Sequence, residues 1–267
     1  MPEISVNGAS IYYKDMGSSP ETIVFSHSYL VDSYHFFPQI QVLKDKYRCL
    51  AYDHRGHGQS EVTNDGYDME NLYADALGFI EGLGCAPCHF VGLSTGGFIG
   101  LRLAIRRPDL LKSLILMDTS ADAEPEENLR QYKLLLFIVR WFGYKPVAGR
   151  VMPLFFGKKF LNDPARQDQV KEWRQRLMAN DRKAMVKFGQ GIFAREGVYD
   201  QLGQIKIPTL MVVGEEDVPT PQAKAERIAQ GIPGARLVSI PDAGHLCTVD
   251  EPATVTKDIE TFLAENS

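Results

Sequence analysis

The chain has 267 residues, of which 44% are hydrophobic and 24% are charged, and its formal net charge is −5. This length and apolar content suffice for one sizeable core with a small accessory lobe, and they exclude two full domains. The acidic balance provides no basic field, so we expect neither nucleic acid nor a membrane as a partner.

No targeting segment is expected at the start of the chain. Residues 1–6 lack the basic and apolar stretches of a secretory signal, and no run approaches the roughly 18 apolar residues that cross a bilayer. We therefore expect a cytoplasmic protein that acts on a small molecule.

Short apolar runs predict eight strands, and several of the middle and late runs are continuously apolar, as in strands buried on both faces. The predicted strands cover residues 4–6, 11–15, 22–25, 49–52, 90–92, 113–117, 209–213 and 236–239. Helical patterns lie between them, at residues 36–44, 69–83, 95–106, 221–230 and 253–264. This alternation predicts an α/β fold with a mostly parallel, doubly wound sheet and a ligand crevice at the carboxyl ends of its strands.

The alternation stops between residues 120 and 197. This stretch contains the apolar segments 134–139 and 151–156 and a helical pattern at 168–179. We interpret it as a helical cap, inserted after the strand that ends at Met117, whereas residues 1–119 and 198–267 form the core. Some of the apolar side chains of the cap are expected to form a pocket for an acyl or alcohol group.

The most informative motif is Gly92-Leu93-Ser94-Thr95-Gly96, between a predicted strand and a predicted helix. A strand-to-helix turn this tight holds its central serine in a strained backbone, and the glycines let the turn close. Ser94 is therefore a candidate nucleophile. The N–H of Thr95, at the positive end of the helix, is a candidate donor to an oxyanion.

A candidate acid and a candidate base follow later in the chain. Asp217 comes just after the predicted strand 209–213, and His245 lies in a glycine-containing loop near the C-terminus. The order Ser94, Asp217, His245 is that of nucleophile, acid and base in one particular fold. Glu215 and Glu216 are spare carboxylates beside Asp217.

With these motifs and two more, the chain resembles the α/β-hydrolase superfamily over almost its whole length. It is most similar to small bacterial carboxylesterases and to enol-lactonases of the 3-oxoadipate type, and its relatives include cofactor-free haloperoxidases and arylesterases. The further matching segments are Phe25-Ser26-His27-Ser28-Tyr29 and Tyr52-Asp53-His54-Arg55-Gly56-His57-Gly58-Gln59-Ser60.

The resemblance implies the α/β-hydrolase fold, with an eight-stranded sheet, helices on both faces and an inserted cap. By its position after the His27 motif, it also implies the N–H of Tyr29 as the second oxyanion donor. Many relatives have His-Gly where this chain has His27-Ser28. His54 and His57 are expected to hold their loop by hydrogen bonds.

The predicted function is hydrolysis of a small carboxylic ester by a Ser-His-Asp triad through an acyl-enzyme. The first alternative is hydrolysis of an enol-lactone of the 3-oxoadipate type, whose dianionic substrate needs a cationic clamp. Carbon–carbon bond hydrolysis, peracid formation and a non-catalytic ligand receptor are further alternatives. Candidate clamp residues in the cap are Arg140, Lys145, Arg150 and Lys158, although a solvated surface would carry the same charges.

No cofactor or metal is expected, because no grouping of His, Asp and Cys has metal-ligand spacing. Cys85 and Cys88 have C-x-x-C spacing, but no second pair follows them. Cys247 lies two residues after His245, and we expect it to line the pocket. The sequence does not decide whether the protein forms a homo-oligomer, because cap surfaces and subunit interfaces are both rich in apolar residues.

Overall fold

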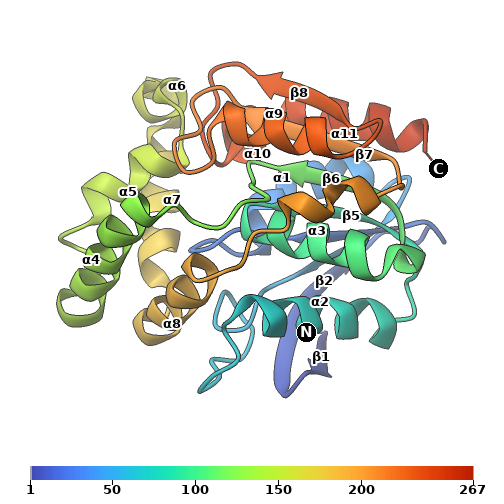
Figure 1. Cartoon of the computed structure of the whole chain (residues 1–267). Helices are drawn as coiled ribbons and strands as arrows, with labels where there is room; N and C mark the ends of the chain where they lie inside the picture. Colours follow the sequence, from blue (N-terminus) through green and yellow to red (C-terminus); the bar gives the residue numbers. More distant parts are fainter. Residues whose placement is uncertain (1, 267) are drawn as a thin grey trace.

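The fold is built on one eight-stranded sheet, described by a computed structural model over residues 2–266 (Figure 1). The strands are β1 (Glu3–Val6), β2 (Ala9–Met16), β3 (Thr22–Ser26), β4 (Arg48–Tyr52), β5 (Cys88–Leu93), β6 (Leu111–Met117), β7 (Thr209–Gly214) and β8 (Arg236–Ile240). They lie in the order β1-β2-β4-β3-β5-β6-β7-β8. Only the pairs β1–β2 and β2–β4 are antiparallel. The predicted mostly parallel α/β sheet is confirmed.

The central strands are buried along their whole length because helices cover both of their faces. Every residue of β3, β5 and β7 is buried. The register pairs Ser26 with Gly92 and Leu93 with Met117, so β3, β5 and β6 end at the same edge of the sheet. Loops that follow these strands therefore meet at that edge.

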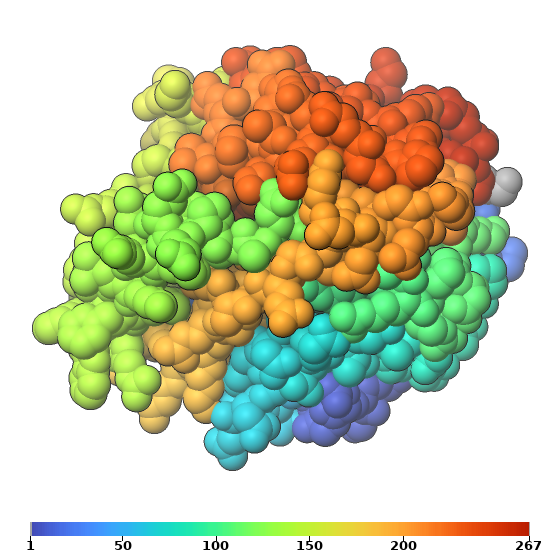
Figure 2. Space-filling view, in the orientation of Figure 1, coloured from blue at the N-terminus to red at the C-terminus, as the bar shows by residue number. Residues whose placement is uncertain are grey.

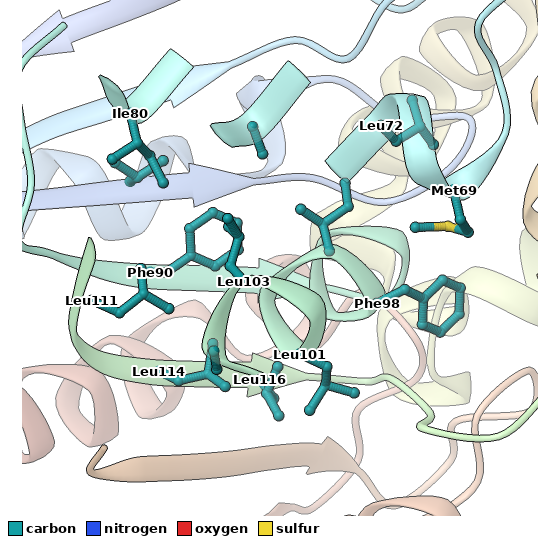
Figure 3. Close-up of a cluster of buried hydrophobic side chains, with 14 of the residues drawn as sticks. Met69, Leu72, Ile80, Phe90, Phe98, Leu101, Leu103, Leu111, Leu114 and Leu116 are labelled. Atoms are coloured by element: carbon teal, nitrogen blue, oxygen red, sulfur yellow. The ribbon is translucent and has the colours of Figure 1, made fainter. Parts of the chain in front are cut away.

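Helices pack on the sheet in two layers. They are α1 (Phe37–Leu43), α2 (Met69–Gly82), α3 (Thr95–Arg106), α9 (Gln222–Gly231), α10 (Cys247–Asp250) and α11 (Pro252–Ala264). Side chains of α2, α3 and α9 share one buried cluster with the sheet, and those of α1 and α11 share another. Figure 3 shows part of the first cluster, in which Leu101 of α3 lies near Leu116 of β6.

The predicted helix 36–44 is divided in the structure. A 3-10 turn, η1 (Ser33–Phe36), precedes α1, which begins at Phe37. Pro38 occupies the first turn of α1, where its missing N–H leaves no hydrogen bond unmade. The other 3-10 turns are η2 (Pro108–Leu110), η3 (Pro164–Arg166) and η4 (Tyr199–Gln204).

Five α-helices lie between β6 and β7, and they gather beyond one end of the sheet (Figure 1). They are α4 (Glu126–Phe142), α5 (Ala148–Phe155), α6 (Lys158–Asn162), α7 (Gln167–Ala179) and α8 (Arg182–Phe193). We refer to residues 120–197 as the cap; its division from the core at these residues stays a prediction. In Figure 2 the yellow-green cap lies directly against the orange and red C-terminal part of the chain.

Candidate active site

Ser94 lies in the sharp turn between β5 and α3. Its backbone has φ 53° and ψ −107°, a strained conformation for a residue with a side chain. A Cβ at Gly92 would lie 2.3 Å from the carbonyl oxygen of Gly96, and one at Gly96 would lie 2.0 Å from that of Ser26. The turn therefore closes only with glycine at both positions.

His245 is held by Asp217 from behind. Its Nδ1 lies 3.0 Å and 3.1 Å from the two carboxylate oxygens of Asp217, and both side chains are buried. Thr220 donates to the same carboxylate from its N–H at 3.0 Å and from its hydroxyl at 2.7 Å. Because an ionised carboxylate only accepts hydrogen bonds, Nδ1 of His245 carries a proton and Nε2 is left as an acceptor.

Burial and charge act in opposite directions on this pair. Burial lowers the pKa of His245, but the charge and hydrogen bond of Asp217, together with the charge of Asp118, raise it above its ordinary value. Burial raises the pKa of Asp217, but the charge and hydrogen bond of His245 and the bonds from Thr220 bring it below its ordinary value. The ion pair is thus favoured once His245 takes a proton.

Ser94 and His245 line the same cavity, which has a volume of about 150 Å³. Its walls come from both core and cap, and most of the cap side chains that line it are apolar. Those apolar cap residues are Leu135, Leu136, Val139, Val147, Ala148, Val151, Met152, Leu154, Phe155, Leu177, Met178, Ile192 and Phe193. A neutral acyl or aryl group fits this lining.

The segment that follows β3 borders the cavity beside Ser94. Tyr29 lines the cavity together with its two neighbours, Ser28 and Leu30. Thr95 is the first residue of α3 and is fully buried. The N–H of Gly96 donates to the carbonyl of His27 at 3.2 Å, which ties the turn of Ser94 to this segment.

Three buried histidines, one of them in this segment, hold it by hydrogen bonds. His27 Nε2 accepts the N–H of His54 at 2.8 Å, and His54 Nε2 donates to the carbonyl of His27 at 2.9 Å. His57 Nε2 accepts the N–H of Leu30 at 3.2 Å. Burial lowers the pKa of His54 to about 4 and that of His57 to about 3, so both stay neutral at pH 7. They bond mainly to backbone groups of the neighbouring segment, whereas the sequence predicts that they hold their own loop; within that loop, Nδ1 of His57 lies 3.3 Å from the carbonyl of Arg55.

The cavity also has a polar wall that the sequence did not indicate. The two Nη atoms of Arg195 each lie 3.2 Å from one oxygen of Glu124, and both residues line the cavity. Their side chains are only 4% and 10% exposed, so the charges are desolvated together. The guanidinium also lies over the ring of Phe98, 4.0 Å from its centroid.

Two predictions about the pocket are wrong. The candidate clamp cations are exposed and do not line the cavity, so they belong to the solvated surface of the cap; they are Arg140, Lys145, Arg150 and Lys158. Cys247 is fully buried and lies outside the lining, and burial, together with the nearby carboxylate of Asp118, raises the pKa of its thiol. It packs behind the site.

Asp250 supports the loop that carries His245. Its Oδ2 accepts the N–H of Gly244 at 2.7 Å and that of Gly157, in the cap, at 2.8 Å. Burial, the largest influence, raises the pKa of Asp250 to about 7. This carboxyl group thus joins the cap to the loop of the candidate base.

The described residues contain neither a metal site nor a membrane-spanning helix. Within residues 2–266, no group of three or more His, Cys, Asp or Glu side chains could hold a metal ion. No helix in the same described range has the length and apolar character needed to cross a membrane.

Comparisons with known proteins agree with this architecture. A family model described as alpha/beta hydrolase fold matches residues 21–252. The crystal structure of an enol-lactonase from Burkholderia xenovorans aligns with a TM-score of 0.91 and 29% identity, covering 98% of this chain and 100% of that one.

Of two further relatives, one is named an esterase and the other an enol-lactonase. A thermophilic esterase from Thermogutta terrifontis aligns with a TM-score of 0.92 and 27% identity, covering 100% of both chains. The 3-oxoadipate enol-lactonase 1 of Acinetobacter baylyi is 29% identical over 86% of this chain and 84% of its own length.

Proposed function

Because the chain belongs to the α/β-hydrolase family, we propose that it is a serine hydrolase that cleaves small carboxylic esters through an acyl-enzyme. One observation carries this proposal: Ser94 and His245 face one cavity, and Asp217 holds His245 from the opposite side. This is the arrangement that turns a weakly nucleophilic hydroxyl into an attacking group.

In the acylation step, the hydroxyl oxygen of Ser94 attacks the ester carbonyl while Nε2 of His245 takes its proton. Asp217 stabilises the imidazolium that forms, without taking the proton itself. The imidazolium then protonates the leaving alcohol. Since Asp217 raises the pKa of His245, the histidine is a stronger base than an isolated buried imidazole.

The negative oxygen of the tetrahedral intermediate is held by the N–H groups of Tyr29 and Thr95 in this proposal. Thr95 begins α3, whose amino end favours negative charge. Tyr29 lies on the segment that Gly96 ties to the turn of Ser94. Each such donor contributes about 10²–10³ in rate. Water then attacks the acyl-enzyme, with His245 again as base.

The substrate class follows from the cavity walls. The cap side chains that surround Ser94 are mainly apolar, and the buried guanidinium of Arg195 is already paired with Glu124. A neutral acyl group therefore fits most of this lining better than a dianion does, because of the two lining arginines only Arg174 lies outside that ion pair.

Enol-lactone hydrolysis is the second candidate. It is favoured by the relatives of that name and by Arg174, an exposed cation that does line the cavity. The same triad opens a lactone, since a lactone is a cyclic ester.

The test is hydrolysis of p-nitrophenyl acetate, butyrate and octanoate, with 3-oxoadipate enol-lactone assayed in parallel. We expect ester turnover in the wild type and its loss in Ser94→Ala. Ser120→Ala is the matched control, because Ser120 is a buried serine outside the cavity lining. Turnover of the lactone alone would establish the second candidate, and full activity in Ser94→Ala would overturn both.

A further inference from the structure

Leu30, which follows the proposed oxyanion donor Tyr29, has a strained backbone. Its φ is 65°, in the left-handed region that residues with a Cβ avoid. This conformation costs about 1–2 kcal/mol per residue, and it persists only where surrounding contacts hold it. The contacts that hold Leu30 therefore also set the direction of the neighbouring peptide groups.

Leu30 is held from two sides. On the core side, its N–H donates to His57 Nε2 at 3.2 Å. On the cap side, the side-chain amide of Asn180 donates to its carbonyl at 2.7 Å. The same amide lies 3.1 Å from the carbonyl of Leu177 and 3.4 Å from that of Arg176, both in α7, the helix that ends just before Asn180. The shortest contact of Asn180 is thus the one that leaves the cap.

The side chain of Tyr29 is held by the cap as well. Its hydroxyl donates to the carbonyl of Met185 in α8 at 2.7 Å. Its ring stacks on Phe188 of the same helix, with centroids 5.6 Å apart and planes at 2°. Figure 1 shows α7 and α8 together on the cap side of the molecule. Tyr29 and Leu30 are therefore both held by cap residues, which lie 156 and 150 residues away in sequence.

We propose that Asn180 is a positioning residue that completes the oxyanion hole only when the cap is seated on the core. With the cap in place, Asn180 and His57 hold the strained backbone of Leu30, and the N–H of Tyr29 faces the cavity. When the cap lifts, Leu30 relaxes and this N–H turns away. Substrate binding beneath the cap and stabilisation of the intermediate are thereby coupled. This inference rests on the proposed function, which assigns the donor to Tyr29.

The alternative is that Asn180 only caps α7, through its contact with Leu177. The two roles differ in what they change. Loss of a helix cap lowers stability and leaves the chemical step intact, whereas loss of a positioning contact lowers kcat at nearly constant KM. Measuring kcat, KM and thermal stability together therefore separates the two roles.

The experiment compares Asn180→Asp, which keeps the shape but removes the donor, with Lys187→Met. Lys187 lies on α8 and donates to the carbonyl of Asn64, so the control removes a cap-to-core hydrogen bond that does not reach the oxyanion segment. Asn180→Ala is the second variant, because it removes the donor without adding a charge. All variants are assayed for p-nitrophenyl butyrate hydrolysis and for thermal unfolding.

Two further readouts are measured. Phenylboronic acid adds to a serine hydroxyl and places an oxygen where the oxyanion forms, so its Kd reports the hole directly. Amide hydrogen exchange across residues 28–31 reports the segment without any need for activity.

We expect kcat of Asn180→Asp and Asn180→Ala to fall about 10-fold or more, with KM within about twofold, because a displaced donor loses part of its contribution. The Kd of phenylboronic acid rises by the same factor, and exchange across residues 28–31 becomes faster. Lys187→Met changes none of these. Unchanged kcat and exchange in both Asn180 variants would overturn the inference. A wild type without turnover or boronate binding would refute the proposed function instead, while the exchange measurement still tests Asn180.

Discussion

Asp217→Asn is the most informative single substitution for the proposed triad. Thr220 limits how the new amide can lie, since its backbone N–H only donates and already points at Oδ1 of Asp217. The amide oxygen must therefore take that position, which places the NH₂ group at the position of Oδ2, beside Nδ1 of His245 at 3.1 Å and the hydroxyl of Thr220 at 2.7 Å. The hydroxyl can rotate to accept.

The consequence falls on the tautomer of His245. The NH₂ group donates to Nδ1 in competition with the amide oxygen, which lies 3.0 Å from Nδ1. Where the NH₂ group donates, the ring proton lies on Nε2, which can then no longer accept the proton of Ser94. A wrong tautomer in a Ser-His-Asp triad lowers kcat by about 10⁴. At 1.36 kcal/mol per factor of ten, this is about 5 kcal/mol of lost transition-state stabilisation.

The pH profile provides a second readout. Protonated His245 cannot act as a base, so kcat/KM falls as the pH drops through its pKa. In the wild type this acid limb lies above the ordinary value of 6.5, because Asp217 and Asp118 outweigh burial. In Asp217→Asn burial persists while the main opposing charge is gone, so the limb moves to lower pH.

The assay measures kcat/KM for p-nitrophenyl butyrate from about pH 5 to about pH 9, a range that includes the acid limb and the plateau above it. Glu215→Gln is the matched control, because it removes an exposed carboxylate two residues away. Retention of more than about a tenth of kcat in Asp217→Asn, or an unmoved acid limb, would refute the reasoning. A large loss in Glu215→Gln would transfer the acid role to that residue.

Three further predictions concern stability. Burial raises the pKa of Asp250 to about 7, so the folded state keeps a proton that the unfolded state releases, and stability falls as pH rises from about 4 to about 7. The Tm of Asp250→Asn minus that of the wild type should therefore increase between about pH 5 and about pH 8. A difference that stays constant over this range would contradict the prediction. Glu124→Gln leaves the guanidinium of Arg195 unpaired and should lower the free energy of unfolding in urea by about 3–5 kcal/mol, whereas a double substitution with Arg195→Met should recover much of that loss. Gly96→Ala places a Cβ 2.0 Å from a backbone oxygen of Ser26, so we expect the free energy of unfolding to fall by at least about 1–3 kcal/mol and ester turnover to be lost. Normal activity would show that the turn can shift to make room for the Cβ.

Local patterns in the sequence were sufficient to predict the sheet and to select the residues of the candidate triad. The strands are short apolar runs, and a doubly wound sheet brings their carboxyl ends together whatever the details of packing. Ser94 and Asp217 directly follow such strands, and His245 lies in a short loop, so their meeting at one edge followed from the topology. The glycines beside Ser94 marked the turn because only glycine fits there.

The residues that complete the site depended on tertiary structure. Arg195 and Asn180 carry no local signal, and their partners lie 71 and 150 residues away. The predicted clamp cations were wrong for a related reason: the cap is rich in both cations and apolar residues, and the sequence could not tell which helix face each would occupy.

The sequence thus determined the sheet and the order of the reactive side chains, because strand ends and glycine turns are set by neighbours along the chain. Only the tertiary structure decided what lines the cavity and what holds its edges. The cap packs on the core through long-range contacts such as that between Asn180 and Leu30, and their geometry depends on the packing of entire helices.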